Sequence, residues 1–230
     1  MTFYLNPGTK AGNATGILQT ALIGCKIEHH TQVASTNDIA IVRGKTGAAE
    51  GTLVIAEHQT AGRGRYGRKW EAPPGKCLLA SVVLRHRLLS DQVPLPNFIG
   101  AIAITQAIQK TYKLDARIKP PNDVRIEKRK VAGVLTEFAY DAQQHPFFVL
   151  GFGVNVNIVL EDFPPELRET ATSVRIARGH SENQNTEVCR ASLLRTILCQ
   201  LEDTYLQLKA GEVDLIMNQF KELREDEGSY

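Results

Sequence analysis

The sequence predicts an α+β domain in which a mixed β-sheet carries packed helices, mainly on one side. Two observations lead to this fold class. Short apolar or β-branched runs bounded by turn residues alternate with segments of helical periodicity, and from about residue 187 the pattern is purely helical. With 230 residues, 43% of them hydrophobic, the chain can bury one large core.

The first predicted elements lie between residues 35 and 84. Ser35-Thr36-Asn37-Asp38 supplies N-cap residues before four apolar positions, which predicts that a helix begins there. Residues 53–57 form a short apolar strand, and residues 58–70 are expected to be a loop because they are rich in glycine and cations. Residues 77–84 form a continuous apolar run, which indicates a buried strand.

The later elements follow the same logic. Apolar residues on one helical face predict a helix over 97–113. Strands at 124–127 and 131–138, separated by Lys128-Arg129-Lys130, indicate a hairpin, and a further strand covers 147–157. Apolar residues at spacings of three and four predict a long helix from 188 to 208, and a second helix follows from about 213 to 225.

Charge and cysteine content restrict the class of protein. Lys plus Arg is 27 and Asp plus Glu is 25, and this near balance argues against a chain that coats nucleic acid or an anionic membrane. The N-terminus lacks the pattern of a signal peptide and no apolar run could span a bilayer, so a cytoplasmic protein without membrane association is expected. The four cysteines have no zinc-site spacing and are expected to be reduced, mostly buried thiols: Cys25, Cys77, Cys189 and Cys199.

The strongest functional motif is Gly62-Arg63-Gly64-Arg65-Tyr66-Gly67-Arg68-Lys69-Trp70. Its four cations repel one another, so the segment is expected to be mobile until an anion binds. Glycines leave backbone N–H groups accessible for phosphate or carboxylate, and arginine suits bidentate recognition of such anions. Trp70 could stack on a planar base. A solvated basic loop and a nucleic-acid patch are the alternative interpretations of this motif alone.

Two further segments carry polar groups suited to the same chemistry. In Lys119-Pro120-Pro121-Asn122-Asp123, the Asp123 carboxylate could hold Mg²⁺ through oxygen. Lys130 begins a strand that could aim its ammonium into a pocket, and Gly133 within that strand suggests close approach of a ligand or another backbone. In Gly151-Phe152-Gly153-Val154-Asn155-Val156-Asn157, alternation places the two asparagines on one face, where an amide could meet the edge of adenine.

Taken together, these motifs resemble the biotin protein ligases, also called biotin–acetyl-CoA-carboxylase ligases. The similarity covers roughly 33–157 and consists of five motifs in the family's order. They are Ser35-Thr36-Asn37, Gln59 with the 62–70 segment, Lys119-x-Pro121-Asn122-Asp123, Lys130-x-Ala132-Gly133, and Gly151-x-Gly153-Val154-Asn155. The resemblance implies a catalytic core related to class II aminoacyl-tRNA synthetases, and a single catalytic domain over 1–230.

The resemblance also implies an activity and a set of site residues. MgATP and biotin would give biotinyl-5′-AMP, and biotin would then pass to a lysine of the biotin carboxyl carrier protein of acetyl-CoA carboxylase. Catalysis would depend on Lys130 and Arg65, and Asp123 would be the metal ligand. Biotin would contact Ser35, Thr36, Asn37, Gln59, Gly62, Arg63, Gly64, Arg65, Lys130 and Gly133. ATP and the adenylate would contact Arg63, Arg65, Arg68, Trp70, Lys119, Asn122 and Asn155.

Three features depart from the family pattern. Position 120 is Pro where the family usually has Trp. Only 34 residues precede Ser35, too few for the helix-turn-helix domain of repressor-ligases, so no operator DNA binding is expected. After the last predicted helix no strand series forms the usual SH3-like barrel, so the barrel is expected to be absent or truncated. A homodimer, which many relatives form, is left open.

Two other functions remain as alternatives. A lipoate ligase would share the fold and the adenylation chemistry, although its Gly-Gly-Gly signature followed by a histidine is absent. A catalytically weak biotin- or nucleic-acid-binding protein could use the cations of residues 63–69, and its binding to DNA would then depend steeply on salt.

Overall fold

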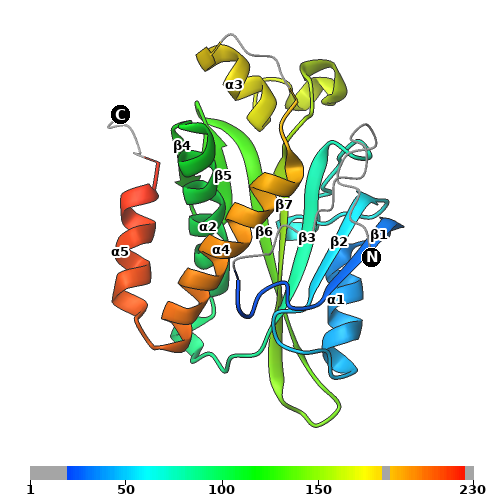
Figure 1. Cartoon of the computed structure of the whole chain (residues 1–230), viewed down its shortest axis with the longest axis vertical. Coiled ribbons are helices and arrows are strands. Elements are labelled where there is room, and N and C mark those ends of the chain that lie inside the picture. Colours follow the sequence, from blue (N-terminus) through cyan, green and yellow to red (C-terminus); the bar gives the residue numbers. More distant parts are fainter. Residues whose placement is uncertain (1–19, 183–186, 226–230) are drawn as a thin grey trace.

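The computed structural model describes residues 20–182 and 187–225, which form one mixed sheet with helices packed against it (Figure 1). The seven strands lie in the order β1-β2-β3-β7-β6-β5-β4. The strands are β1 (Ile27–Val33), β2 (Leu53–Gln59), β3 (Cys77–Leu84), β4 (Ala116–Lys119), β5 (Asp123–Ile126), β6 (Arg129–Tyr140) and β7 (Pro146–Asn155). The helices are α1 (Thr36–Lys45), α2 (Leu95–Tyr112), α3 (Val174–Glu182), α4 (Arg190–Lys209) and α5 (Val213–Leu223).

The sheet is mixed because its first pair of strands runs parallel. The chain leaves β1, forms α1 and returns as β2 beside β1 in the same direction. Every other neighbouring pair is antiparallel. The longest registers are those of β7, which pairs with β3 from Cys77↔Asn155 to Leu84↔Phe148 and with β6 on its other side. These three central strands therefore form the rigid platform of the domain.

The two faces of the platform have different coverings. Alternate residues of β3, such as Leu78 and Val82, pack into the main core with α2 and α4. The opposite face packs against α1 near one end, through Val54, Val83 and Val149 around Ala40. Because β3 is covered on both faces, all eight of its residues are buried. Figure 1 shows α2 and α4 lying across one face of the sheet, with α5 beside them.

Most predicted elements are confirmed, with shifts of a few residues at their ends. Strand β3 has the bounds expected from its apolar run, and β5 with β6 forms the expected hairpin. Three elements were not predicted: β1, β4 and α3. Strand β1 lies at the edge of the sheet and is only partly buried, so its sequence lacks the apolar run that marked the inner strands.

One sequence-based expectation needs a shifted boundary, and another was wrong. Residues 60–70 lie outside the regular strands, as expected of a loop, but β2 continues to Gln59 and residues 62–70 turn back on themselves as a hairpin. The four thiols are free, but they are not mostly buried, since Cys25 and Cys189 are exposed and Cys77 is buried. No described helix combines the length and the apolar character that a bilayer crossing needs. The N-terminal residues that bear on a signal peptide lie outside the described ranges.

A buried carboxylate joins the start of the described chain to α4. Glu202, which is 7% exposed, accepts hydrogen bonds from the backbone N–H groups of Ala21, Leu22 and Ile23 at 2.6–2.7 Å. These three donors belong to a segment without regular secondary structure of its own, so they depend on the side chain for an acceptor.

We expect Glu202→Ala to lower the free energy of unfolding by about 2 kcal/mol, because it leaves these backbone donors without their acceptor. Urea unfolding measures the loss. The control is Asp203→Ala, which removes the neighbouring carboxylate on the exposed side of the same helix. Equal stability of the two variants would show that the carboxylate does not anchor the segment.

Candidate active site

A cavity of about 480 Å³ opens on the sheet face that also carries α1. It brings together the start of α1, the 62–70 hairpin, the β4–β5 turn, and the central strands β6 and β7. All but one of the site residues predicted from the sequence line it. These are Ser35, Thr36, Asn37, Gln59, Arg63, Gly64, Arg65, Arg68, Trp70, Lys119, Asn122, Asp123, Lys130, Gly133 and Asn155.

The floor of the cavity depends on two glycines of β7. A Cβ at Gly151 would lie 2.0 Å from Asn37 Oδ1, and a Cβ at Gly153 would lie 2.6 Å from the Trp70 ring. Both residues point to the α1 face of the sheet, because their neighbours Phe152 and Val154 pack into the opposite core. The missing side chains therefore allow an amide and an indole to rest directly on the sheet backbone.

Above this floor, α1 begins with polar side chains turned toward the sheet. Ser35 occupies the N-cap position, but its side chain makes no capping hydrogen bond. Thr36 donates through its backbone N–H and its hydroxyl to Gln59 Oε1, at 2.7 and 3.0 Å. The fully buried Ser81 hydroxyl lies 2.7 Å from Thr36 Oγ1 and 2.6 Å from Asn37 Oδ1. This end of the cavity is thus a pre-formed set of hydrogen-bonding groups.

Residues 62–70 form a short antiparallel turn, which we call the arginine hairpin. Gly64 N–H donates to the Arg68 carbonyl at 2.7 Å, and Trp70 N–H donates to the Gly62 carbonyl at 2.9 Å. At its tip Tyr66 and Gly67 have φ of 58° and 73°, the left-handed values that a tight hairpin turn requires. The mobility expected of this segment stays a prediction.

Gly62, which was predicted to contact biotin, is not among the residues that line the cavity. It is buried at the base of the arginine hairpin, where a Cβ would lie 2.5 Å from the Trp70 carbonyl oxygen. The close approach of the two hairpin arms explains why this position is a glycine, without reference to a ligand.

Arg63 is held by carboxylates of two other elements. Its guanidinium donates to Asp38 on α1 at 2.7 and 2.9 Å and to Glu137 on β6 at 3.0 Å. The hydrogen bonds to Asp38, together with those to Glu137, raise the pKa of Arg63, so the guanidinium stays charged. No sequence motif predicted these partners, since Asp38 and Glu137 lie 25 and 74 residues from Arg63.

Lys130 and Arg65 reach the cavity from different elements, β6 and the arginine hairpin. Lys130 is fixed by backbone hydrogen bonds of 2.8 Å to Thr170 and Thr172, and its Nζ lies 2.7 Å from Asp123 Oδ1. Arg65 Nη1 donates weakly to Asn122 Oδ1 at 3.4 Å. The two cations therefore have polar neighbours on the same β4–β5 turn, which keeps both near the cavity.

Trp70 lines the cavity beside Lys130. Lys130 Nζ lies 5.5 Å from the centroid of the indole, within range of a cation–π interaction. The indole Nε1 is buried and has no hydrogen-bond acceptor among the described residues. A bound ligand with an acceptor atom at this position would satisfy it.

The two asparagines at the end of β7 have different roles. Asn155 lines the cavity, with its Nδ2 donating to the Thr172 carbonyl at 3.0 Å. Asn157 lies beyond the strand and is bonded instead to the backbone of Val188 through both ends of its amide. Beside them, burial raises the pKa of the Cys77 thiol to about 12, so this cysteine is an unreactive neighbour of the site.

Gly153→Ala tests the floor of the cavity. The new methyl group would meet the indole, so we expect Trp70 to be displaced toward solvent and its fluorescence emission to shift to longer wavelength. Trp70 is the sole tryptophan of the chain, so the signal is unambiguous. The control is Gly179→Ala on α3, where a Cβ would have no neighbour within 4 Å. An emission spectrum that does not differ from wild type would contradict the contact.

Comparison with known proteins agrees with this geometry. The model of the Biotin/lipoate A/B protein ligase family matches residues 29–155. The bifunctional ligase/repressor BirA of Bacillus subtilis is 34% identical over 188 residues, which is 82% of this chain and 56% of that protein. The biotin–[acetyl-CoA-carboxylase] ligase of Mycobacterium tuberculosis is 35% identical over 144 residues, 59% of this chain and 51% of that protein. The chain thus spans just over half the length of these relatives.

Solved structures share the fold. Biotin protein ligase from Aquifex aeolicus, in complex with biotin and ATP, superposes with a TM-score of 0.68 at 26% identity, covering 81% of this chain and 72% of that one. Biotin protein ligase from Leishmania major, in complex with biotinyl-5-AMP, gives a TM-score of 0.71 at 22% identity, covering 90% and 84%. The chain belongs to the Biotin/lipoate A/B protein ligase family.

Proposed function

We propose that this chain activates biotin with MgATP as biotinyl-5′-AMP and transfers it to a lysine of the biotin carboxyl carrier protein of acetyl-CoA carboxylase. The observation that carries the proposal is the convergence of cations from three separate segments on one cavity: Arg65, Lys119 and Lys130. The name of the mycobacterial relative and the biotin and ATP held by the Aquifex structure support this choice of substrates.

The first step joins two anions. A carboxylate oxygen of biotin bonds to the α-phosphorus of ATP, and the bond from that phosphorus to pyrophosphate breaks. Such a reaction needs no enzyme nucleophile, but it needs positive charge aimed at the oxygens where negative charge develops. Lys130 and Arg65 are suited to this role because both line the cavity and each reaches it from a different element.

The remaining cavity residues would position the substrates. Thr36, Asn37 and Gln59 present hydroxyl and amide groups that match the polar ureido ring of biotin. Asn122 holds Arg65, and Trp70 offers both an aromatic face and the buried Nε1 that lacks an acceptor. We assign the adenylate side of the cavity to Trp70, Arg68 and Asn155.

The second step consumes the mixed anhydride. The ε-amine of the acceptor lysine bonds to the biotinyl carbonyl carbon, AMP leaves, and the amine loses a proton. Water would compete with the lysine, so the adenylate must be covered until the acceptor arrives. The arginine hairpin is placed to give this cover, because Arg63, Gly64 and Arg65 form one wall of the cavity.

A magnesium ion fits this site only as a partner of the nucleotide. Asp123 offers a carboxylate, but one of its oxygens is paired with Lys130. Among the described residues no three His, Cys, Asp or Glu side chains are grouped as a metal site. One carboxylate with phosphate and water ligands is an arrangement that Mg²⁺ accepts, and the bound ion would neutralise phosphate charge.

We expect Lys130→Ala and Arg65→Ala to lower biotin-dependent ATP–pyrophosphate exchange about a hundredfold to a thousandfold, because each removes a charge that stabilises the transition state. Melting temperatures close to wild type would show that the fold is intact. The control is Lys128→Ala, which removes a cation from the β5–β6 turn outside the cavity. Near-normal exchange in both cavity variants would exclude them from the mechanism.

Lipoate is the second candidate substrate, because the matching family model includes lipoate as well as biotin ligases. Calorimetric titration of the same chain with each acid separates the two functions. We expect binding of biotin, and a preference for lipoate would overturn the proposed substrate.

A further inference from the structure

Arg63 joins the arginine hairpin to carboxylates on two other elements of the cavity. Among the described residues, it is the only cation of the hairpin with carboxylate partners. Asp38 on α1 accepts two hydrogen bonds from the Arg63 guanidinium, and Glu137 Oε2 on β6 lies 3.0 Å from Arg63 Nη2. We call this arrangement of Arg63, Asp38 and Glu137 the Arg63 clamp.

Glu137 is shared between the hairpin and the cavity floor. Its Oε2, which accepts from Arg63, also accepts from Asn37 Nδ2 at 2.5 Å. The same Asn37 amide donates to the Leu135 carbonyl at 3.3 Å, and its oxygen lies 2.6 Å from the Ser81 hydroxyl. A continuous hydrogen-bonded path therefore runs from buried Ser81 through Asn37 and Glu137 to the arginine hairpin.

The charges of the Arg63 clamp favour the closed position of the arginine hairpin. Asp38 and Glu137 meet at the same guanidinium, so with the hairpin open two carboxylates would face each other across the cavity edge. They would repel each other, and they would also repel an anionic ligand. Arg63 offsets this repulsion when the hairpin closes. The side chains are 37%, 46% and 30% exposed for Arg63, Asp38 and Glu137, so each pair is partly screened by solvent.

We propose that Asp38 and Glu137 are positioning residues, which hold the arginine hairpin closed through Arg63 and couple its closure to the side chain of Asn37. A ligand that orders Asn37 would thereby also order Glu137 and strengthen the clamp. The inference rests on the proposed function only for the identity of that ligand, because the clamp is formed by the chain alone.

Trypsin gives a direct measure of closure, since it cleaves after Arg65, Arg68 and Lys69 when the hairpin is open. We expect Asp38→Asn with Glu137→Gln to raise the rate of cleavage at these bonds about tenfold in the ligand-free chain. Glutamine keeps an acceptor for Asn37 but removes the charge that pairs with Arg63. The fluorescence of Trp70, quenched by acrylamide, reports the same opening without a protease.

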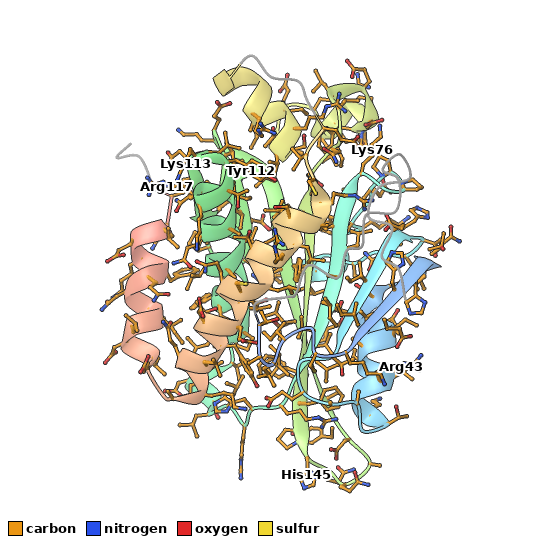
Figure 2. The ribbon with its side chains drawn as sticks, in the orientation of Figure 1. Arg43, Lys76, Tyr112, Lys113, Arg117 and His145 are labelled. Carbon is orange, nitrogen blue, oxygen red and sulfur yellow. The ribbon has the colours of Figure 1, made fainter. Side chains whose placement is uncertain are left out.

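The matched control is Glu28→Gln. It removes a carboxylate that holds Arg43 at 2.7 Å in two hydrogen bonds, joining β1 to α1 outside the cavity. Arg43 is labelled in Figure 2, on the helix that also carries Asp38. Cleavage of the hairpin should be unchanged in this variant. The substitution Arg63→Lys keeps the charge but loses the bidentate fork, so it should give an intermediate rate.

Hairpin cleavage of the double variant at the wild-type rate would overturn the clamp. Cleavage that rises equally after Lys128 or Arg129, away from the hairpin, would also overturn it, because it would indicate general unfolding. The failure of the proposed function is a separate result. If biotin and MgATP do not slow cleavage of the wild-type hairpin, the proposed substrates are wrong. The comparison of the variants without ligand still tests whether the Arg63 clamp holds the hairpin closed.

Discussion

The site depends on the absence of side chains at a few positions on one face of the central sheet. Gly151 and Gly153 leave room for Asn37 and Trp70 to lie against the backbone of β7, and Gly133 does the same for Lys130 on β6. Any larger residue would move these groups outward and fill the cavity. The cationic and hydrogen-bonding groups can converge only because the floor beneath them is flat.

The second constraint is electrostatic. The cavity gathers several cations, and cations held close together repel one another. Two of these cations are offset by carboxylates of other elements: Asp123 pairs with Lys130, and Asp38 and Glu137 pair with Arg63. These ion pairs keep the cations in place at little cost, because all five side chains are partly open to solvent and can exchange partners.

The sequence predicted those parts whose pattern is local. The apolar run of β3 predicted its bounds, whereas the glycine–arginine segment was predicted only as an anion-binding loop and not as a hairpin. It did not predict β1, whose edge position leaves it without an apolar run. Nor did it assign roles to Asp38, Ser81 and Glu137, because their contacts with the site residues arise from tertiary packing between distant segments. Gly62, which was predicted to contact biotin, lies outside the cavity lining, and the sequence could not show this because a structural glycine and a ligand-binding glycine look the same in a motif.

Strands β3 and β7 pass through two environments at once, with core on one face and cavity or α1 on the other. Alternate residues of β7 therefore have different roles. Phe152 and Val154 pack in the core, and Gly151 and Gly153 leave room for side chains of the site. Substitution of a core-facing residue should lower thermal stability, and substitution of the site-facing residue next to it should lower ligand affinity. A scan along this single strand would therefore separate, residue by residue, what the protein needs to fold from what it needs to act.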